Sequence, residues 1–201
     1  MAILGNNETD GVAHAITIAD KEYGGPGVVD KRAGASWTAI ENGEITSISG
    51  YFRSSFGSNT VSITAFINST DSGGSGTHAE LAKKELTNVS VGTSSSWTTF
   101  TLDTPISMTK DSKYLINFSC DASTIDQEYD WVLLIIDQTK VYDAYGEDQT
   151  YGSEENPWVG DAFSEYEPCC YITYTPTTKQ LTYGSGRITS SGTGTLRFSN
   201  E

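Results

Sequence analysis

The feature that most constrains this chain is an alternation of apolar and polar residues with a period of two. Residues 60–67 (TVSITAFI) and 114–120 (YLINFSC) alternate in this way, which is typical of strands with one buried face. Residues 130–137 (DWVLLIID) form a continuous apolar run between two acids, which predicts a central strand that is covered on both faces. Helical periodicity is nearly absent: only residues 78–86 (HAELAKKEL) allow a short helix, and they allow an edge strand equally well.

Turn residues such as Asn42-Gly43 separate the candidate strands, and Pro105 and Pro176 lie where strands are expected to begin or end. Short strands with turns between them predict an all-β fold, an antiparallel β-sandwich of jelly-roll type. The predicted strands lie near residues 12–19, 34–40, 44–54, 59–68, 78–91, 97–103, 105–109, 113–122, 130–137 and 169–175, with a short one near 140–145.

The length of 201 residues suits one sandwich with an extension. We expect residues 1–176 to form the β-sandwich domain and residues 177–201 to form a C-terminal arm or connector. The arm carries Lys179, Arg187 and Arg197 and has no acid before Glu201, whereas the body is acidic. Such a polar segment cannot bury enough apolar surface to order alone, so we expect contact with another subunit or another particle protein to order it. The alternative is a disordered linker.

The formal net charge of -14, from 26 acids against 12 bases, argues against nucleic acid and anionic membranes as partners. No apolar run approaches the roughly 20 residues of a membrane-spanning helix. The first residues, MAILGNNETDG, lack the basic start and apolar core of a secretory signal. Two alternatives stay open: a signal was removed, or the protein is made and assembled in the cytosol.

Three cysteines, Cys120, Cys169 and Cys170, form an odd set with a vicinal pair, which is not a disulfide framework. We expect three buried or partly buried thiols. The alternative is a single bridge from Cys120 to either Cys169 or Cys170. No C-x-x-C motif occurs, so a zinc site is not expected.

Four stretches carry a family resemblance, in order along the chain: residues 33–52 (AGASWTAIENGEITSISGYF), 59–68, 97–114 and 171–175 (YITYT). They resemble a recurring β-sandwich domain of phage, archaeal-virus and metagenomic surface proteins, with its "x-I-T-S-I-S-x-Y" and closing "Y-A-T-Y-T" patterns. The resemblance implies a non-catalytic module of fibres, virion surfaces or adhesins, similar in some members to carbohydrate-binding modules. This chain departs from the pattern at residues 109–111, where a glycine is usual, so the partner is not carried over.

The sequence contains no recognisable catalytic motif. Only two histidines, His14 and His78, are present, and there is no G-x-S-x-G, P-loop or dinucleotide fingerprint. Each histidine is expected to be a surface or strand residue. A glycosidase needs only two facing carboxylates, which an acidic sequence does not exclude. We predict that the protein is not an enzyme.

The long segment 147–168 mixes acids with aromatic residues, and loops of this length are usually functional or mobile. Trp158, Tyr151, Tyr166 and Phe163 are the candidate binding residues, because aromatic rings in loops can stack on sugars. The alternative is that Trp158 packs the loop onto the sandwich. Three further tryptophans lie in predicted strands and are expected in the core: Trp37, Trp97 and Trp131.

Calcium is the one cofactor that the sequence leaves open. Asp126, Glu128 and Asp130 are weak candidate ligands, since sandwich loops often supply carboxylate oxygens to calcium. The alternative is solvated charge that keeps an acidic protein soluble. No other metal or cofactor is expected.

Together these features predict a non-catalytic virion structural protein of the capsid-decoration, spike or fibre-head type. Its expected partners are other virion subunits or further copies of itself, with a host-surface glycan as a further partner. Its expected location is the virion surface, after assembly in the host cytoplasm. The alternative is a secreted, extracellular carbohydrate-binding module or adhesin domain.

Overall fold

The computed structural model describes residues 1–9, 14–21, 28–70, 78–125, 130–137, 144–149, 161–162, 167–177, 189–191 and 195–197. This part of the chain is built from strands and one short 3-10 helix, η1 (Ala122–Thr124), so the all-β prediction is confirmed. The strands are β1 (Ala2–Gly5), β2 (His14–Lys21), β3 (Val28–Thr38), β4 (Gly43–Ser54), β5 (Asn59–Ser69), β6 (Glu80–Val91), β7 (Ser96–Met108), β8 (Lys113–Cys120), β9 (Asp130–Asp137), β10 (Ala144–Gln149), β11 (Asp161–Ala162), β12 (Glu167–Pro168), β13 (Cys170–Pro176), β14 (Thr189–Ser191) and β15 (Thr195–Arg197).

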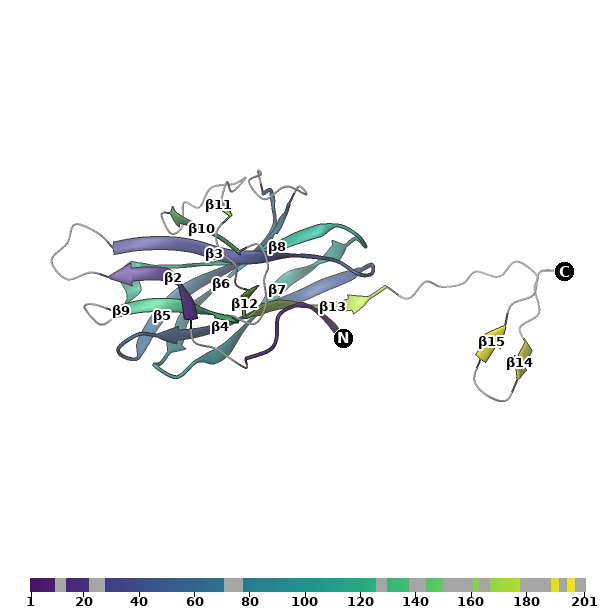
Figure 1. Ribbon diagram of the computed structural model, residues 1–201, viewed down its shortest axis with the longest axis horizontal. Helices are drawn as coiled ribbons and strands as arrows, with labels where there is room; N and C mark the ends of the chain where they lie inside the picture. Colours follow the sequence, from purple (N-terminus) through teal and green to yellow (C-terminus); the bar gives the residue numbers. More distant parts are fainter. Residues whose placement is uncertain are drawn as a thin grey trace.

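Thirteen strands belong to one sheet, in which every pairing is antiparallel. Its main path runs β1-β13-β4-β9-β2-β3-β8-β5-β6, and β7 pairs with the other edge of β4 (Figure 1). Strand β4 is therefore central: β7 lies on one side of it, and β13 followed by β9 lies on the other. Strands β14 and β15 pair only with each other among the described residues.

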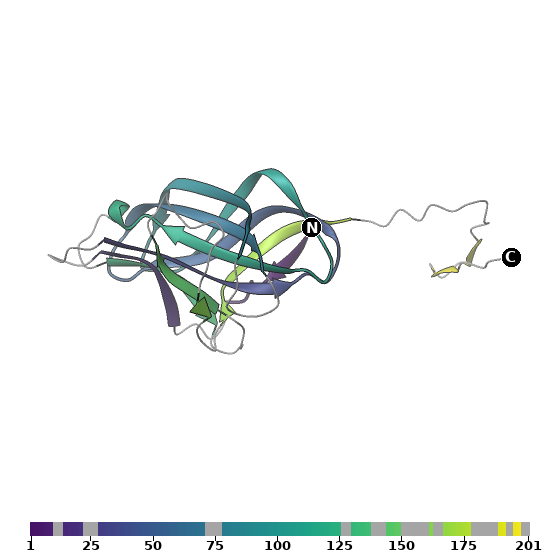
Figure 2. The ribbon, with the colours of Figure 1, turned by 90° about the horizontal axis from the view of Figure 1, so that it is seen from above.

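The large sheet folds over on itself to enclose one hydrophobic core (Figure 2). Phe118 of β8 packs edge-on against Phe52 of β4, with ring centroids 5.1 Å apart, and lies 5.8 Å from Phe100 of β7. Strands from the two halves of the sheet thus face each other across the core, which gives the sandwich-like character that the alternation predicted. The finer jelly-roll topology fits this arrangement and stays a prediction.

The strand predicted at 78–91 is confirmed as β6, but two local features differ from the sequence-based expectation. The short N-terminal strand β1 was not predicted. The two strands expected at 97–103 and 105–109 are one strand, β7. The register of β7 against β4 shifts between the pairs Ile45–Ile106 and Ser47–Thr101, which leaves the exposed Pro105 in a bulge. Because residues in the bulge do not pair with β4, the missing N–H of the proline costs no hydrogen bond between the strands.

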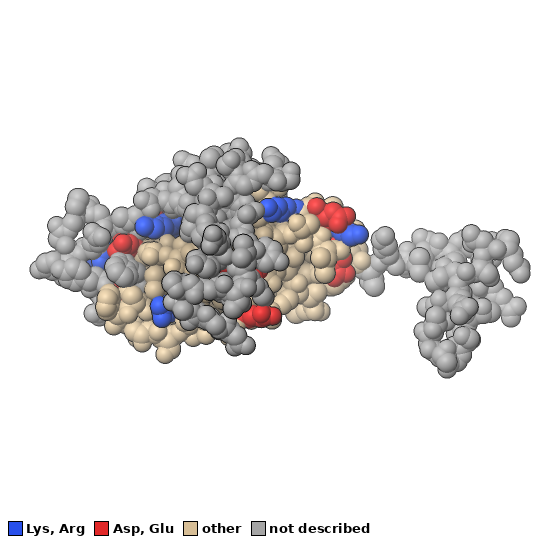
Figure 3. Space-filling model, viewed as in Figure 1, with Lys and Arg blue, Asp and Glu red and all other residues tan. Residues whose placement is uncertain are grey.

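All three cysteines are free and buried, as the first of the two alternatives predicted. Burial is the largest cause that raises the pKa values of the Cys120 and Cys170 thiols well above their ordinary value. No helix in the described part of the chain is long and apolar enough to cross a membrane. On the face in Figure 3, uncharged side chains cover most of the described surface, and the charged ones lie in a few small groups.

Candidate binding face

Three neighbouring strands, β13, β4 and β7, share one side-chain pattern. Each places one aromatic residue and two hydroxyl residues at alternate positions, and the residues between them point into the core. Among these inner residues, Ile48, Phe52, Phe100 and Ile172 are all fully buried, so the alternate residues lie on the outer face of the sheet. The outer residues are Ser47, Ser49 and Tyr51 in β4, Trp97, Thr99 and Thr101 in β7, and Tyr171, Thr173 and Thr175 in β13.

The strand register brings the three aromatic residues together. Tyr51 pairs with Trp97 across the β4–β7 ladder, and Ser49 pairs with Tyr171 across the β4–β13 ladder. The ring of Trp97 lies 5.0 Å from the ring of Tyr51 and 5.0 Å from the ring of Tyr171, at interplanar angles of 36° and 58°. We call these three residues the aromatic strip.

The aromatic strip lies over β4. Strands β7 and β13 flank β4, so their backbones are about 9–10 Å apart, yet the Trp97 and Tyr171 ring centroids are only 5.0 Å apart. The two rings must lean toward each other above the small residue Ser49, which is only 1% exposed. Ser49 Oγ in turn lies 2.9 Å from Thr99 Oγ1, a hydrogen bond that fixes the floor of the strip.

Strand β1 supports the strip at its β13 end. Gly5 pairs with Tyr171 and has a φ of +122°. A Cβ at this position would lie 2.5 Å from the Cys170 carbonyl oxygen and 2.7 Å from Tyr171 Cα. A larger residue would therefore push β1 away from the backbone that carries Tyr171.

The strip offers both apolar surface and polar groups. Tyr51, Trp97 and Tyr171 are each only partly buried. Within the described structure, no hydrogen bond engages the two tyrosine hydroxyls or the Trp97 indole N–H. Rings with an apolar face and an unpaired polar edge, beside the exposed threonines Thr99, Thr101 and Thr175, suit a ligand that is itself apolar on its faces and hydroxylated around its rim.

The position of Trp97 corrects one expectation. Trp97 was expected in the core with Trp37, but it lies partly exposed on the outer face. Phe100 and Leu102 are buried on the inner face of β7, and Trp97 belongs to the alternate set of residues that points the other way. Trp37 is in the core as predicted, 7% exposed, and its Nε1 donates a hydrogen bond of 2.8 Å to the buried Glu167 carboxylate. The side chain of Trp131 lies outside the described residues.

The sequence itself contains a signal for the strip. It is the repeated pattern of hydroxyl, any, hydroxyl, any, aromatic, read forward in β4 and in reverse in β7 and β13. The predicted loop residues Trp158, Tyr151, Tyr166 and Phe163 lie outside the described residues, so they stay predictions.

Of the three calcium candidates, only Asp130 lies within the described residues. It is fully buried, and its two oxygens accept six hydrogen bonds from the turn between β4 and β5. Oδ1 accepts from the Ser55 N–H, the Ser55 hydroxyl and the Phe56 N–H. Oδ2 accepts from the Ser54 hydroxyl, the Gly57 N–H and Asn59 Nδ2.

This set of donors accounts for the ionisation of Asp130. Burial acts to raise its pKa, but hydrogen bonds from Ser54, Ser55, Asn59 and the Phe56 N–H together lower the pKa well below the ordinary value. The ionised carboxylate is thus a structural anchor for the turn. Among the described residues, no three His, Cys, Asp or Glu side chains are grouped as metal ligands.

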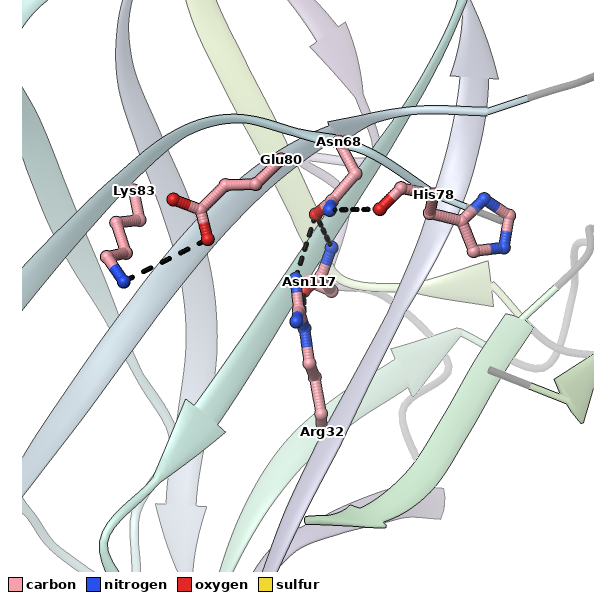
Figure 4. Close-up of polar contacts among 6 residues, drawn as sticks. All are labelled: Arg32, Asn68, His78, Glu80, Lys83 and Asn117. Carbon is pink, nitrogen blue, oxygen red and sulfur yellow. Dashed lines mark hydrogen bonds and ion pairs between the residues drawn. The ribbon is translucent and has the colours of Figure 1, made fainter. Parts of the chain in front are cut away.

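A second buried polar network surrounds Arg32 of β3, which is fully buried (Figure 4). Its Nε donates to Asn117 Oδ1 at 2.5 Å, one Nη donates to Asn68 Oδ1 at 2.9 Å, and its guanidinium lies 3.9 Å from the Phe66 ring centroid. Asn68 also donates to the His78 carbonyl oxygen. The network joins β3, β5 and β8, and His78, expected as a surface or strand residue, is fully buried beside it.

Comparison with protein-family models, with curated proteins and with solved structures gives no match for this chain. The chemistry of the outer face and the resemblance in the sequence are the two features that point to a function.

Proposed function

We propose that this protein is a non-catalytic structural domain of a surface assembly that contacts a glycan through the outer face of β13, β4 and β7. The observation that carries the proposal is the aromatic strip, with Trp97 in contact with both Tyr51 and Tyr171. Partly exposed apolar groups gathered in one place mark interaction surfaces more often than single exposed residues do. The hydroxyl residues around the strip make a sugar the best-matched partner.

The resemblance of residues 33–175 to virion and adhesin modules supports a role in particle assembly or host-surface contact. The same surface would serve a spike or fibre head as well as a secreted carbohydrate-binding module. Mass spectrometry of purified particles separates these settings, because a virion protein must be present in the particle.

The test of glycan binding is a glycan-array screen followed by calorimetric titration of the best ligand. Trp97→Ala should weaken binding by roughly tenfold or more, the range for a central aromatic contact, while the melting temperature changes little. Phe56→Ala is the matched control, because Phe56 is 69% exposed and lies in the β4–β5 turn, away from the strip. An array without any bound glycan, or equal binding by Trp97→Ala and the unmodified protein, would refute the proposal.

A further inference from the structure

Arg53 stands two residues beyond Tyr51 in β4, and so on the same outer face. At a rise of about 3.3 Å per residue, its Cα lies roughly 7 Å from that of Tyr51. Its backbone pairs with Leu133 of β9, past the point where β7 ends its pairing with β4. Arg53 therefore borders the aromatic strip at its Tyr51 end.

Among the residues that the structure describes, the guanidinium of Arg53 has no counter-charge. Arg53 is half-buried, and its Nε is buried without a hydrogen-bond partner in the described part of the chain. None of the ion pairs among the described residues includes it. This is unusual in a protein with 26 acids and 12 bases, because buried polar groups are nearly always satisfied.

Other cations of low exposure in the described structure have partners. Arg32 donates to two asparagine side chains, Lys84 pairs with Asp103 at 2.7 Å, and Lys21 donates to the Ile125 carbonyl. The contrast shows that this fold supplies acceptors where a cation is purely structural. Arg53, on the face that carries the strip, has no such acceptor in the described part of the chain.

We infer that Arg53 is a specificity residue that selects a carboxylated glycan, with the sugar rings on the aromatic strip and the carboxylate on the guanidinium. This inference rests on the proposed glycan-binding function. The planar guanidinium forms paired, charge-assisted hydrogen bonds to a carboxylate, which are stronger than hydrogen bonds between neutral groups. The sugar carboxylate supplies the acceptor that Arg53 lacks among the described residues.

The negative net charge of the protein does not oppose this contact. Glu44 of β4 is nine residues from Arg53, about 30 Å along the strand, and Asp103 of β7 is neutralised by Lys84. Charges beyond about 8 Å are largely screened at physiological ionic strength. Asp130, which accepts hydrogen bonds from Ser54 and Ser55 next to Arg53, is already engaged by its six donors.

The test compares a carboxylated sugar with its methyl ester, which keeps the rings and removes the charge. Suitable pairs are trigalacturonic acid and its methyl ester, and sialyllactose and its methyl ester. We expect the unmodified protein to bind the acid about tenfold or more tightly than the ester, a difference typical of hydrogen bonds to a charged group. Arg53→Gln should bind acid and ester equally, Arg53→Lys should retain part of the preference, and added salt should reduce it.

The outcomes separate the two proposals. If the unmodified protein binds acid and ester equally and Trp97→Ala binds neither, the role of Arg53 is refuted and glycan binding still stands. An acid preference that survives in Arg53→Gln also refutes it. Absence of binding by both sugars in both pairs also refutes the role of Arg53. A glycan array without any bound glycan, or binding that Trp97→Ala does not change, refutes both proposals. The comparison of acid with ester needs no variant, so an unstable Arg53→Gln protein does not prevent the test.

Discussion

Asp130 offers the sharpest test of the way this sheet is held together, through the substitution Asp130→Asn. Asparagine has the same shape as aspartate, but one of the two oxygens becomes an NH2 group that cannot accept hydrogen bonds. Each Asp130 oxygen accepts from three donors. Whichever way the amide turns, three donors of the β4–β5 turn lose their acceptor.

The expected cost follows from that count. A net value of about 1 kcal/mol for each lost hydrogen bond gives a destabilisation of about 3 kcal/mol. For a chain of this size that corresponds to a decrease of about 6–12 °C in melting temperature. The measurement is urea unfolding together with a thermal melt. The matched control is Asp111→Asn, a side chain 79% exposed, where a change within about 0.5 kcal/mol is expected.

The same substitution should change the dependence of stability on pH. The pKa of Asp130 is lower in the folded protein than in the unfolded chain, where it is about 3.9. Its ionised form therefore stabilises the fold above about pH 4, and this contribution is lost as the pH falls further toward the folded pKa. Asp130→Asn should remove this part of the acid sensitivity. If Asp130→Asn were as stable as Asp111→Asn, or if its stability fell with acid as steeply as before, the anchoring role would be wrong.

Two further predictions test the core and the C-terminal arm. Phe118→Ala should destabilise the protein by about 3–5 kcal/mol in urea unfolding, because Phe118 is fully buried against Phe52 and Phe100; a change below about 0.5 kcal/mol would contradict its place in the core. A chain that ends at Thr177 should keep its melting temperature within about 2 °C. Among the described residues, Thr177 is the last to donate a hydrogen bond to the body, to the Asn42 carbonyl oxygen, and β14 pairs only with β15. A large loss of stability on truncation would show that the arm belongs to the fold.

The alternation of residues was enough to predict most strands of the described fold, including β4, β5, β8 and β9, to within a few residues. It could not reveal which long-range contacts these strands make. Asp130 appears in the sequence as an acid at the start of a strand, and its actual role depends on donors 71 to 76 residues away. Arg32 is comparable, since its amide partners lie in two other strands. Such contacts depend on the sheet register, which local patterns do not specify.

Trp97 shows that a strand can be predicted correctly while one of its residues is assigned to the wrong face of the sheet. Hydrophobicity alone favours an inward tryptophan, but alternation groups Trp97 with Thr99 and Thr101, opposite Phe100 and Leu102. Since Phe100 is fully buried, one side of β7 is already committed to the core. The alternation was the better guide, because a strand cannot bury residues of both parities when only one of its faces is covered.

The outer aromatic residues are also not needed to hold the register of β4 and β7. The next outward pair along the same two strands, Ser49 and Thr99, keeps that register with hydroxyls and a 2.9 Å hydrogen bond. The core below is filled by Ile48, Phe52 and Phe100 whatever residue stands at position 97. A partly exposed tryptophan that is required by neither the core nor the ladder favours a contact role outside the fold. Binding and melting temperature should therefore respond separately to Trp97→Ala.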